Sequence, residues 1–376
     1  MVQTQFASRK KVGQSRNQIT ADGQIGAIEK EIRETPYHKG TQRHIGILRA
    51  KLARLKDQSI EASTKSSGGG GGYAVKKQGD ATAVLVGLPS VGKSTLLNKL
   101  TNAKSKVAPY SFTTVSVIPG MMKYKNAMIQ VLDVPGLIKG AEEGKGRGRE
   151  VLSVVRGANL MIIMTDPANI DAFESISKAL ERNGIRVNKT PPEATIDKKP
   201  GGGIIIHSNI KQEVDQETIK ELAMQFGIRN AEIILNERLS WDRLIDAFAK
   251  NRVYIPAIFV VNKADLLLEN STINTSMYRY LQISAKKEEG LEELRQEIWN
   301  KLNFVQVYLV KEENPDRENP MVVKKGVTLQ AVAEKIGADF ATDKTSAKIW
   351  GSGAKYPGQE VSLSTVVRDG MQIKFL

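Results

Sequence analysis

The stretch Gly87-Leu-Pro-Ser-Val-Gly-Lys-Ser-Thr95 limits what this chain can fold into more than any other part of the sequence. It fits the phosphate-loop pattern G-x-x-x-x-G-K-[ST], in which backbone N–H groups of a glycine-rich turn point at phosphate oxygens. An apolar run at 83–86 precedes it and suits a buried strand, and residues 95–100 can open a helix whose N-terminus adds partial positive charge. This context predicts an α/β nucleotide-binding domain rather than a glycine turn beside a surface lysine.

The side chains of this loop predict how it would hold a nucleotide. Lys93 is expected to reach the β- and γ-phosphates, and the hydroxyl of Ser94 is expected to bind Mg²⁺. The remaining positions shape the turn and supply N–H groups. The predicted phosphate-binding residues are Gly87, Pro89, Ser90, Val91, Gly92, Lys93, Ser94 and Thr95.

A threonine pair and a D-x-x-G motif follow the phosphate loop. Asp133-Val-Pro-Gly136 ends an apolar run and begins 40 residues after Lys93 (133 − 93). Asp133 is expected to hold Mg²⁺ through water, and the N–H of Gly136 is expected to sense a γ-phosphate. Thr114 is preferred to Thr113 as the switch threonine. The sequence thus predicts metal contacts by Ser94, Thr114 and Asp133, and catalytic roles for Lys93, Thr114 and Gly136.

A second set of motifs predicts which base is bound. Asn262-Lys-Ala-Asp265 follows the apolar run 258–261 and matches N-K-x-D. Asp265 is expected to accept hydrogen bonds from N1–H and the 2-amino group of guanine, Asn262 to contact the N7/O6 edge, and Lys263 to pack its stem over the base. Adenine lacks those donors and would leave Asp265 buried and unpaired, a mismatch that can discriminate by about 10⁴ or more. An ATP-using P-loop protein is therefore the weaker alternative.

A short S-A-K motif completes the predicted guanine site. In Ser284-Ala-Lys286 the N–H of Ala285 is expected to meet guanine O6. The tripeptide alone predicts nothing, but here it comes third in order after two firmer motifs. The predicted base-binding residues are Asn262, Lys263, Asp265, Ser284, Ala285 and Lys286.

Composition narrows the class of protein that carries this site. The chain has 376 residues, enough for about two or three domains, and 40% of them are hydrophobic. It has no cysteine, which excludes disulfides and cysteine-ligated metals. No apolar run approaches the roughly 18 residues of a membrane span, and the polar N-terminus does not suit a secretory signal. A cytoplasmic protein with no membrane partner is expected.

The charge of the chain favours a polyanionic partner. The formal net charge is +14, and residues 1–80 carry 15 Lys and Arg against 7 Asp and Glu, so +8 of the excess lies at one end. RNA is the simplest partner for such an excess. The alternative is that the charge serves only solubility, which does not explain its uneven distribution.

The N-terminal region predicts a basic helical hairpin. Residues 1–20 are expected to form a flexible arm, and the five glycines at 68–72 a flexible joint. Apolar faces are predicted from Ile25, Ile28 and Ile32 in one helix and from Leu48, Leu52 and Leu55 in the next. The second helix also carries the basic residues Arg49, Lys51, Arg54 and Lys56. Whether this basic face lies on RNA or is solvated stays open from the sequence.

The region between the two sets of motifs is long. Asp133 and Asn262 are 129 residues apart (262 − 133), about twice the spacing of a minimal GTP-binding domain. The excess at about 171–239 includes a strand-like run at 204–207 and an amphipathic helix at 217–226, which predicts a small inserted α+β subdomain. Its basic loop at 198–203 either meets RNA or is solvated.

From residue 304 the pattern changes to short strands around one helix. Strands are predicted at 305–310, 321–323, 347–350, 359–363 and 371–376, with a helix at 328–336. Two strands, a helix and further strands within so short a stretch are typical of a β-grasp domain.

With these motifs in view, the chain resembles the developmentally regulated GTP-binding proteins, the DRG branch of the Obg-like GTPases. The resemblance covers nearly everything after about residue 25. Its most specific stretches are Ala50-Lys-Leu-Ala-Arg-Leu55, residues 87–95, Phe112-Thr-Thr114, Asp133-Val-Pro-Gly-Leu-Ile-Lys-Gly-Ala141 and Asn188-Lys-Thr-Pro-Pro192.

The resemblance implies a particular organisation and activity. It implies an arm and helical hairpin at 1–65, a P-loop GTPase domain at 66–303 with the inserted subdomain, and a C-terminal TGS domain of β-grasp fold at 304–376. It also implies Mg²⁺-dependent hydrolysis of GTP to GDP and phosphate, tied to the ribosome or to translation. Nothing carries over to the first 20 residues.

One position departs from the usual GTPase pattern. Many GTPases place a glutamine just after D-x-x-G to orient the attacking water, but this chain has Leu137 there, so slow intrinsic hydrolysis is expected. A backbone group, a bound K⁺ or an activating protein partner would have to order the water. K⁺-using relatives often carry Asn where this loop has Ser90, so dependence on K⁺ stays open. Arg147 and Arg149 either stabilise charge in the switch or are solvated or bound to RNA.

Two functions are compatible with these features. The first is a monomeric GTPase that acts on the ribosome, with rRNA or tRNA as its partner. The second is an RNA-binding scaffold in which GTP or GDP is a slowly turned-over structural ligand. Turnover measured with and without ribosomes would separate them.

Overall fold

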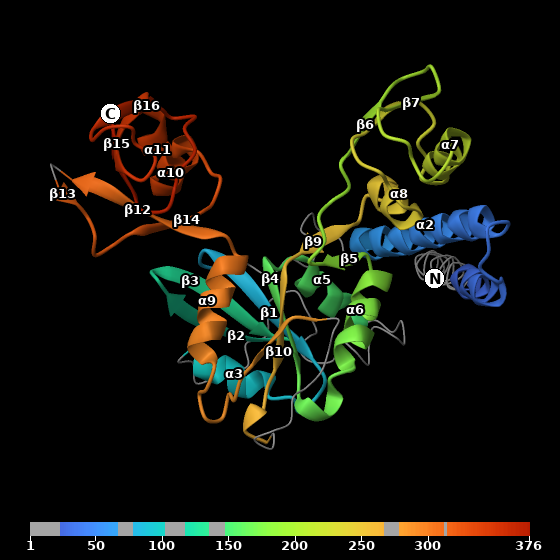
Figure 1. Ribbon diagram of the computed structural model, residues 1–376, viewed down its shortest axis with the longest axis horizontal. Helices are drawn as coiled ribbons and strands as arrows, with labels where there is room; N and C mark the ends of the chain where they lie inside the picture. The colour runs from blue at the N-terminus through green and yellow to red at the C-terminus, as the bar shows by residue number, and fades with distance from the viewer. Residues whose placement is uncertain (1–22, 67–77, 102–116, 135–146, 267–277, 312–313) are drawn as a thin grey trace, which may run out of the picture. The chain divides into compact units, whose positions relative to one another are not determined.

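The computed structural model describes residues 23–66, 78–101, 117–134, 147–266, 278–311 and 314–376. Its chain forms two compact units (Figure 1). The first unit combines residues up to 72 with residues 183–254, and the second combines residues 73–182 with residues 255–376. Among the described residues, no helix is both long and apolar enough to cross a membrane.

The second unit is built on a six-stranded sheet of order β11-β10-β4-β1-β3-β2. Its parallel strands are β1 (Ala81–Gly87), β3 (Ala127–Asp133), β4 (Leu160–Thr165), β10 (Ala257–Val261) and β11 (Tyr280–Gln282). The edge strand β2 (Ile118–Tyr124) runs antiparallel to β3. Every residue of β1, β4 and β10 is buried, as expected for a parallel sheet covered on both faces.

Helices cover this sheet and fix the position of the nucleotide motifs. The helices are α3 (Lys93–Leu100), α5 (Arg147–Arg156), α6 (Ala172–Arg182) and α9 (Leu291–Lys301). The helices α3 and α9 share one apolar core with alternate residues of β1, including Leu85. Phe173 of α6 packs edge-on against Phe259 of β10, with ring centroids 5.1 Å apart. Since β3 and β4 lie on opposite sides of β1, the chain order reverses at β1, and ligands of such folds bind at that switch point.

The C-terminal part of the second unit has the expected β-grasp fold. Its elements are β12 (Phe304–Lys311), β13 (Asn314–Pro315), β14 (Met321–Lys324), α10 (Leu329–Ile336), α11 (Ala338–Thr342), β15 (Ser346–Gly351), β16 (Gln359–Ser362) and β17 (Met371–Phe375). The strand β12 pairs in parallel with β17 and antiparallel with β14. Leu329 and Val332 of α10 join Val307 and Ile373 of the sheet in one buried core.

The first unit is a small α+β subdomain wrapped by the N-terminal helices. It contains the helix 23–34, α2 (Gln42–Ser66), β5 (Ile185–Val187), β6 (Ala194–Lys198), β7 (Ile204–Ser208), α7 (Gln216–Gln225), β8 (Ala231–Leu235), α8 (Trp241–Phe248) and β9 (Val253–Ile255). Three strands form a sheet of order β6-β8-β7, and β5 pairs with β9. Ala50 of α2 lies in the same core as Ile219 of α7 and Leu244 of α8.

The N-terminal helices are therefore not an isolated hairpin. The helix α2 packs so closely on α8 that a methyl group on Gly46 would lie 2.1 Å from the ring of Trp241. The expected insertion at about 171–239 also differs from the observed grouping. The helix α6 belongs to the second unit, whereas α8 completes the core of the first, so residues 183–254 form the compact part.

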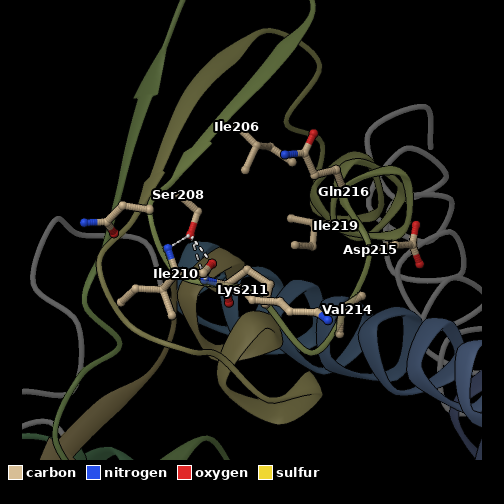
Figure 2. A pocket seen from close by; sticks show the side chains of 10 residues that line it. Ile206, Ser208, Ile210, Lys211, Val214, Asp215, Gln216 and Ile219 are labelled. Carbon is tan, nitrogen blue, oxygen red and sulfur yellow. Dashed lines mark hydrogen bonds between the residues drawn. The ribbon is translucent and has the colours of Figure 1, made fainter.

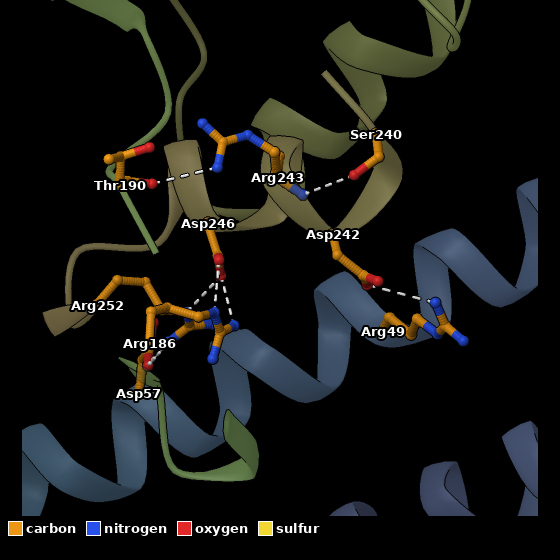
Figure 3. A network of polar contacts seen from close by, with 9 residues as sticks. All are labelled: Arg49, Asp57, Arg186, Thr190, Ser240, Asp242, Arg243, Asp246 and Arg252. Carbon is orange, nitrogen blue, oxygen red and sulfur yellow. Dashed lines mark hydrogen bonds and ion pairs between the residues drawn. The ribbon is translucent and has the colours of Figure 1, made fainter. Parts of the chain in front are cut away.

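A buried ion network joins α2 to the ends of the inserted segment (Figure 3). Arg186 in β5 donates to both carboxylate oxygens of Asp246 at 2.6 Å, and Arg252 donates to Asp246 at 2.9 Å and to Asp57 of α2 at 3.1 Å. These four side chains are 8–14% exposed. Because Arg186 and Arg252 stand at the two ends of the segment, the network holds both ends on α2.

Some of the basic side chains expected on one face of α2 form ion pairs with acidic residues of the same unit. Arg49 lies 3.3 Å from Asp242, and Lys56 lies 2.7 Å from Glu29. Lys51 is exposed, as is Arg54. The remaining basic surface is thus smaller than the sequence suggests.

Replacing Gly46 with alanine should destabilise the first unit. The new methyl group would overlap Trp241, and overpacking of this kind costs about 1–3 kcal/mol. Gly26→Ala is the matched control, since nothing lies within 4 Å of its position in the helix 23–34. There the substitution should stabilise by about 0.5–1 kcal/mol. Urea unfolding followed by tryptophan fluorescence measures both, and equal effects would contradict the close packing of α2 on α8.

Asp246→Asn should lower the stability of the same unit. The change leaves two buried guanidinium groups without their shared carboxylate, and breaking a buried pair costs about 3–5 kcal/mol. Asp242→Asn serves as its control, because that side chain is 72% exposed and its pair with Arg49 is worth about 0–1 kcal/mol. Loss of stability of similar size in the two variants would show that the network does not support the unit.

Candidate functional site

The sequence motifs meet at the carboxyl ends of the parallel strands. Gly87 ends β1 beside Met164 of β4, and Asp133 ends β3 two residues from the end of β1. The strand β10 ends at Val261, next to Thr165 of β4 and Gln282 of β11. The phosphate loop, the D of D-x-x-G, the N-K-x-D and the S-A-K therefore lie along one edge of one sheet.

The lysine of the phosphate loop bonds back to the start of the same loop. The Nζ of Lys93 donates to the carbonyl of Gly87 at 3.2 Å and to that of Leu88 at 2.9 Å. Two residues of the turn, Ser90 and Gly92, have left-handed backbone conformations, with φ of 63° and 93°. At Gly92 a methyl group would also lie 2.3 Å from the Nδ2 atom of Asn262, so this position requires glycine.

Burial changes the acid–base character of Lys93. Loss of solvent lowers the pKa of its ammonium group, and the carboxylate of Asp133 opposes that change. The site thus combines a partly desolvated cation with one nearby carboxylate. Such a cation is well suited to neutralise phosphate oxygens.

Ser94 and Asp133 provide oxygen atoms for a divalent cation. The hydroxyl of Ser94 donates to the Oδ2 atom of Asp133 at 2.6 Å. The Oδ1 atom of the same carboxylate is buried and has no hydrogen-bond partner among the described residues. A buried carboxylate oxygen without a partner is costly, and hydroxyl and carboxylate oxygens are the ligands that Mg²⁺ prefers. These residues therefore fit Mg²⁺.

Asn262 connects the phosphate loop to the S-A-K loop. Its Nδ2 donates to the carbonyl of Val91 at 2.8 Å, and its Oδ1 accepts from the N–H of Ala285 at 2.9 Å. Its backbone N–H donates to the carbonyl of Thr165 in β4. The residue is 3% exposed, so its side chain braces two loops from a buried position.

This bracing adds contacts within the protein to those predicted for Asn262 and Ala285. One of the two N–H donors of Asn262 and its carbonyl oxygen are used within the protein, which leaves one N–H donor of this amide. The N–H of Ala285 donates to Asn262, and the contacts with guanine predicted for these two residues remain predictions. The contacts within the protein form because the two loops lie close enough to bond to each other.

Asp265 accepts a hydrogen bond from one neighbouring side chain, and Lys263 forms an ion pair with another. The hydroxyl of Ser284 donates to the Oδ1 atom of Asp265 at 2.7 Å and lowers the pKa of that carboxyl group, which stays ionised at neutral pH. The ammonium of Lys263 lies 3.2 Å from the carboxylate of Asp166. Burial raises the pKa of Asp166, but hydrogen bonds from Asn169 and Lys263 outweigh it and lower the pKa overall.

Asp166 also lies in the site, although it belongs to none of the sequence motifs. It follows β4 immediately, at the same edge of the sheet as the other motifs, and fixes the Lys263 side chain. The available signal was its position, since polar residues just after a buried parallel strand point into the ligand-binding edge. No spacing rule marked it.

Several predicted residues lie outside the described part of the chain. Thr113, Thr114, Gly136 and Leu137 are among them. The side chains of Arg147 and Arg149 are not described either. The roles predicted for these residues remain predictions.

A cavity of about 340 Å³ in the first unit contains none of the motif residues (Figure 2). It lies between β7 and α7, with Ile206 and Ile219 on facing sides. The hydroxyl of Ser208 and the amide of Gln212 bond to each other at 2.9 Å, and Asp215 caps α7. The described residues that carry the nucleotide motifs all lie at the sheet edge, so that edge is the candidate site.

Known protein families match consecutive parts of the chain: a GTPase domain first and a TGS domain at the C-terminal end. A family described as "50S ribosome-binding GTPase" matches residues 82–198, and the C-terminal region of that domain matches residues 201–304. The TGS domain matches residues 305–376.

Individual relatives are similar over nearly the whole chain. An uncharacterized GTP-binding protein of Methanocaldococcus jannaschii is 45% identical over 92% of this chain and 90% of its own. Developmentally-regulated G-protein 3 of Arabidopsis thaliana is 41% identical, over 92% and 95% respectively. Human developmentally-regulated GTP-binding protein 2 is 38% identical, over 90% and 94%. The chain belongs to the developmentally regulated GTP-binding proteins and combines a P-loop GTPase domain with a C-terminal TGS domain.

Proposed function

We propose that this protein hydrolyses GTP to GDP and phosphate in a Mg²⁺-dependent reaction and acts as a ribosome-associated factor in translation. The observation that carries the proposal is the buried bridge of Asn262 between the phosphate loop and the S-A-K loop. It makes the phosphate-binding and base-binding groups parts of one rigid site. A guanine nucleotide is the ligand that engages both ends.

The phosphate end of the site is assigned to the loop 87–95. Its N–H groups and the ammonium of Lys93 donate hydrogen bonds to the β- and γ-phosphate oxygens. To do so, Lys93 gives up its bonds to the loop carbonyls. Ser94, Asp133 and Thr114 are the residues proposed to hold Mg²⁺, which when bound neutralises charge that develops between the β- and γ-phosphates. The N–H of Gly136 is proposed to report the presence of the γ-phosphate.

The base end is assigned to Asp265 and the residues that orient it. The Ser284 hydroxyl holds one oxygen of this carboxylate and keeps it ionised, so that both oxygens accept from guanine N1–H and the 2-amino group. Asp166 holds Lys263 so that its stem covers the base. Because Asn262 occupies the N–H of Ala285, we assign the contact with guanine O6 to the next N–H, that of Lys286.

The rate of hydrolysis is proposed to depend on a partner. Leu137 offers no polar group to orient water, so intrinsic turnover is slow and an activating partner or K⁺ completes the site. The ribosome is the proposed partner because the matched family is described as ribosome-binding and because the chain carries an excess of positive charge. Its rRNA or bound tRNA would supply the phosphates, and a cytoplasmic monomer fits this role.

Asp265→Asn should change the base that is recognised. The amide can donate to the 2-oxo group of xanthine but cannot accept from the 2-amino group of guanine. Charge-assisted hydrogen bonds are worth about 1.5–3 kcal/mol each, so the affinity for GTP should fall by about 10²-fold or more while that for XTP rises. Competition against a fluorescent GTP analogue measures both, with Asp242→Asn in the other unit as the control. Equal binding of ATP and GTP by the unaltered chain would contradict the assignment of the base site.

GTP turnover should be slow for the protein alone and should rise by about tenfold or more when ribosomes are added. Phosphate release is measured with excess GTP, with and without ribosomes and with EDTA to remove Mg²⁺. Lys93→Ala and Ser94→Ala are the matched variants and should lose turnover in both conditions while remaining folded. A rate that ribosomes leave unchanged would favour the alternative, an RNA-binding scaffold with a structural nucleotide.

A further inference from the structure

The turn between the helix 23–34 and α2 presents an exposed tyrosine. All residues from 36 to 40 are exposed, and Tyr37 is 65% exposed. Among the described residues, the other aromatic side chain exposed to a similar degree is Tyr356 of the β-grasp domain, at 62%. We call residues 35–41 the hairpin tip.

The hairpin tip is braced by its own hydrogen bonds. The hydroxyl of Thr41 donates to the carbonyl of Pro36 at 2.6 Å and accepts from the N–H of His38 at 3.1 Å. The N–H of Gly40 donates to the Nδ1 atom of His38 at 3.2 Å. With the backbone of the turn fixed in this way, Tyr37 loses little conformational freedom when it contacts a partner.

Acidic side chains near the hairpin tip each lie beside a basic side chain. Glu34 lies 3.8 Å from Lys30, and Glu31 lies 2.9 Å from His44. Further along α2, Arg49 is paired with Asp242 of α8. Glu34 and Asp242 are thus paired with full cations, whereas Glu31 bonds to an imidazole that is charged only if protonated.

Other cations of the hairpin remain available. Arg33, Lys39, Lys51 and Arg54 are exposed, and no ion pair joins any of them to another described residue. Lys51 and Arg54 are three residues apart on α2 and so lie on one face of that helix. Arg54 also follows Gly46 and Ala50 at four-residue intervals, so it borders the side of α2 that packs on the inserted subdomain, but its own side chain is exposed.

We propose that the hairpin tip and the exposed face of α2 form a binding site for unpaired RNA. Tyr37 stacks on one base and Lys39 contacts a phosphate beside it, while Lys51 and Arg54, about 14–18 Å along α2 from its first residue, contact phosphates further along the same strand. Aromatic stacking and cationic tracking of the backbone are how proteins hold single strands without reading sequence. The charge favours RNA over a protein partner, because cations without an ion pair gain most from the closely spaced phosphates of a polyanion. The proposal rests on the proposed function for the source of that RNA, the ribosome.

The test uses substitutions in the full chain. Deleting the N-terminal helices would expose the core around Ala50, so a truncated chain would not report on RNA contacts alone. The probe is a single-stranded RNA of about 12 nucleotides with 2-aminopurine at its centre, whose fluorescence reports stacking. A duplex of the same length is the control, because it offers no unpaired base. Affinity is measured by anisotropy across a salt series.

Tyr37→Ala should weaken binding of the single strand by about 5- to 100-fold and remove the stacking signal, with the salt slope unchanged. Tyr37→Phe should bind like the unaltered chain, because the phenyl ring still stacks. Tyr356→Ala, the exposed tyrosine of the other unit, should have no effect. Lys51→Gln with Arg54→Gln should lower the salt slope by about 0.7 for each phosphate that the variant no longer neutralises. Binding of the duplex should not respond to Tyr37→Ala.

Other outcomes would overturn the site. These are unchanged affinity in Tyr37→Ala, failure of Tyr37→Phe to bind, or an equal loss in Tyr356→Ala. Thermal unfolding of Tyr37→Ala should match that of the unaltered chain, since the side chain is exposed. GTP turnover separates this inference from the proposed function: if binding depends on Tyr37 but ribosomes do not accelerate hydrolysis, the site stands and the translational role fails.

Discussion

The side-chain amide of Asn262 is the interaction on which the nucleotide site depends. One side chain joins the phosphate loop through Val91 to the S-A-K loop through Ala285, and its backbone is tied to β4 through Thr165. All of this happens in a buried setting, where an unpaired amide would be costly. The two loops proposed to contact the ends of a guanine nucleotide therefore cannot move independently, and Gly92 is required because the amide of Asn262 lies where a side chain would begin.

Much of the second unit could be predicted because its pattern is local. Parallel strands buried on both faces appear in the sequence as short apolar runs, and each motif follows such a run. The run at 83–86 became β1 (Ala81–Gly87), and the run at 258–261 became β10 (Ala257–Val261). What could not be predicted is how groups from separate loops pair. Asn262 and Ala285 satisfy one another, and Asp166 enters the site from a strand without a recognised motif.

The first unit was harder to predict because its contacts are distant in sequence. Amphipathic spacing marks an apolar face on α2, but it does not say what covers that face. Small residues at 46, 50 and 53 permit close approach of other helices, and the partners are α7 and α8 rather than a neighbour in the chain. The same limitation explains the boundaries: α6 looks like part of the excess sequence, yet its Phe173 packs on the GTPase sheet.

The contact between Asp57 and Arg252 joins residues 195 positions apart. During synthesis at about 5–20 residues per second, α2 emerges about 10–40 s before the segment that covers it. Most of the strands of the GTPase sheet are made in that interval. The apolar side of α2 thus has to remain soluble, or be shielded, until α8 and Arg252 arrive. The high density of charged groups on its other faces suits a helix that must wait in solution before it can pack.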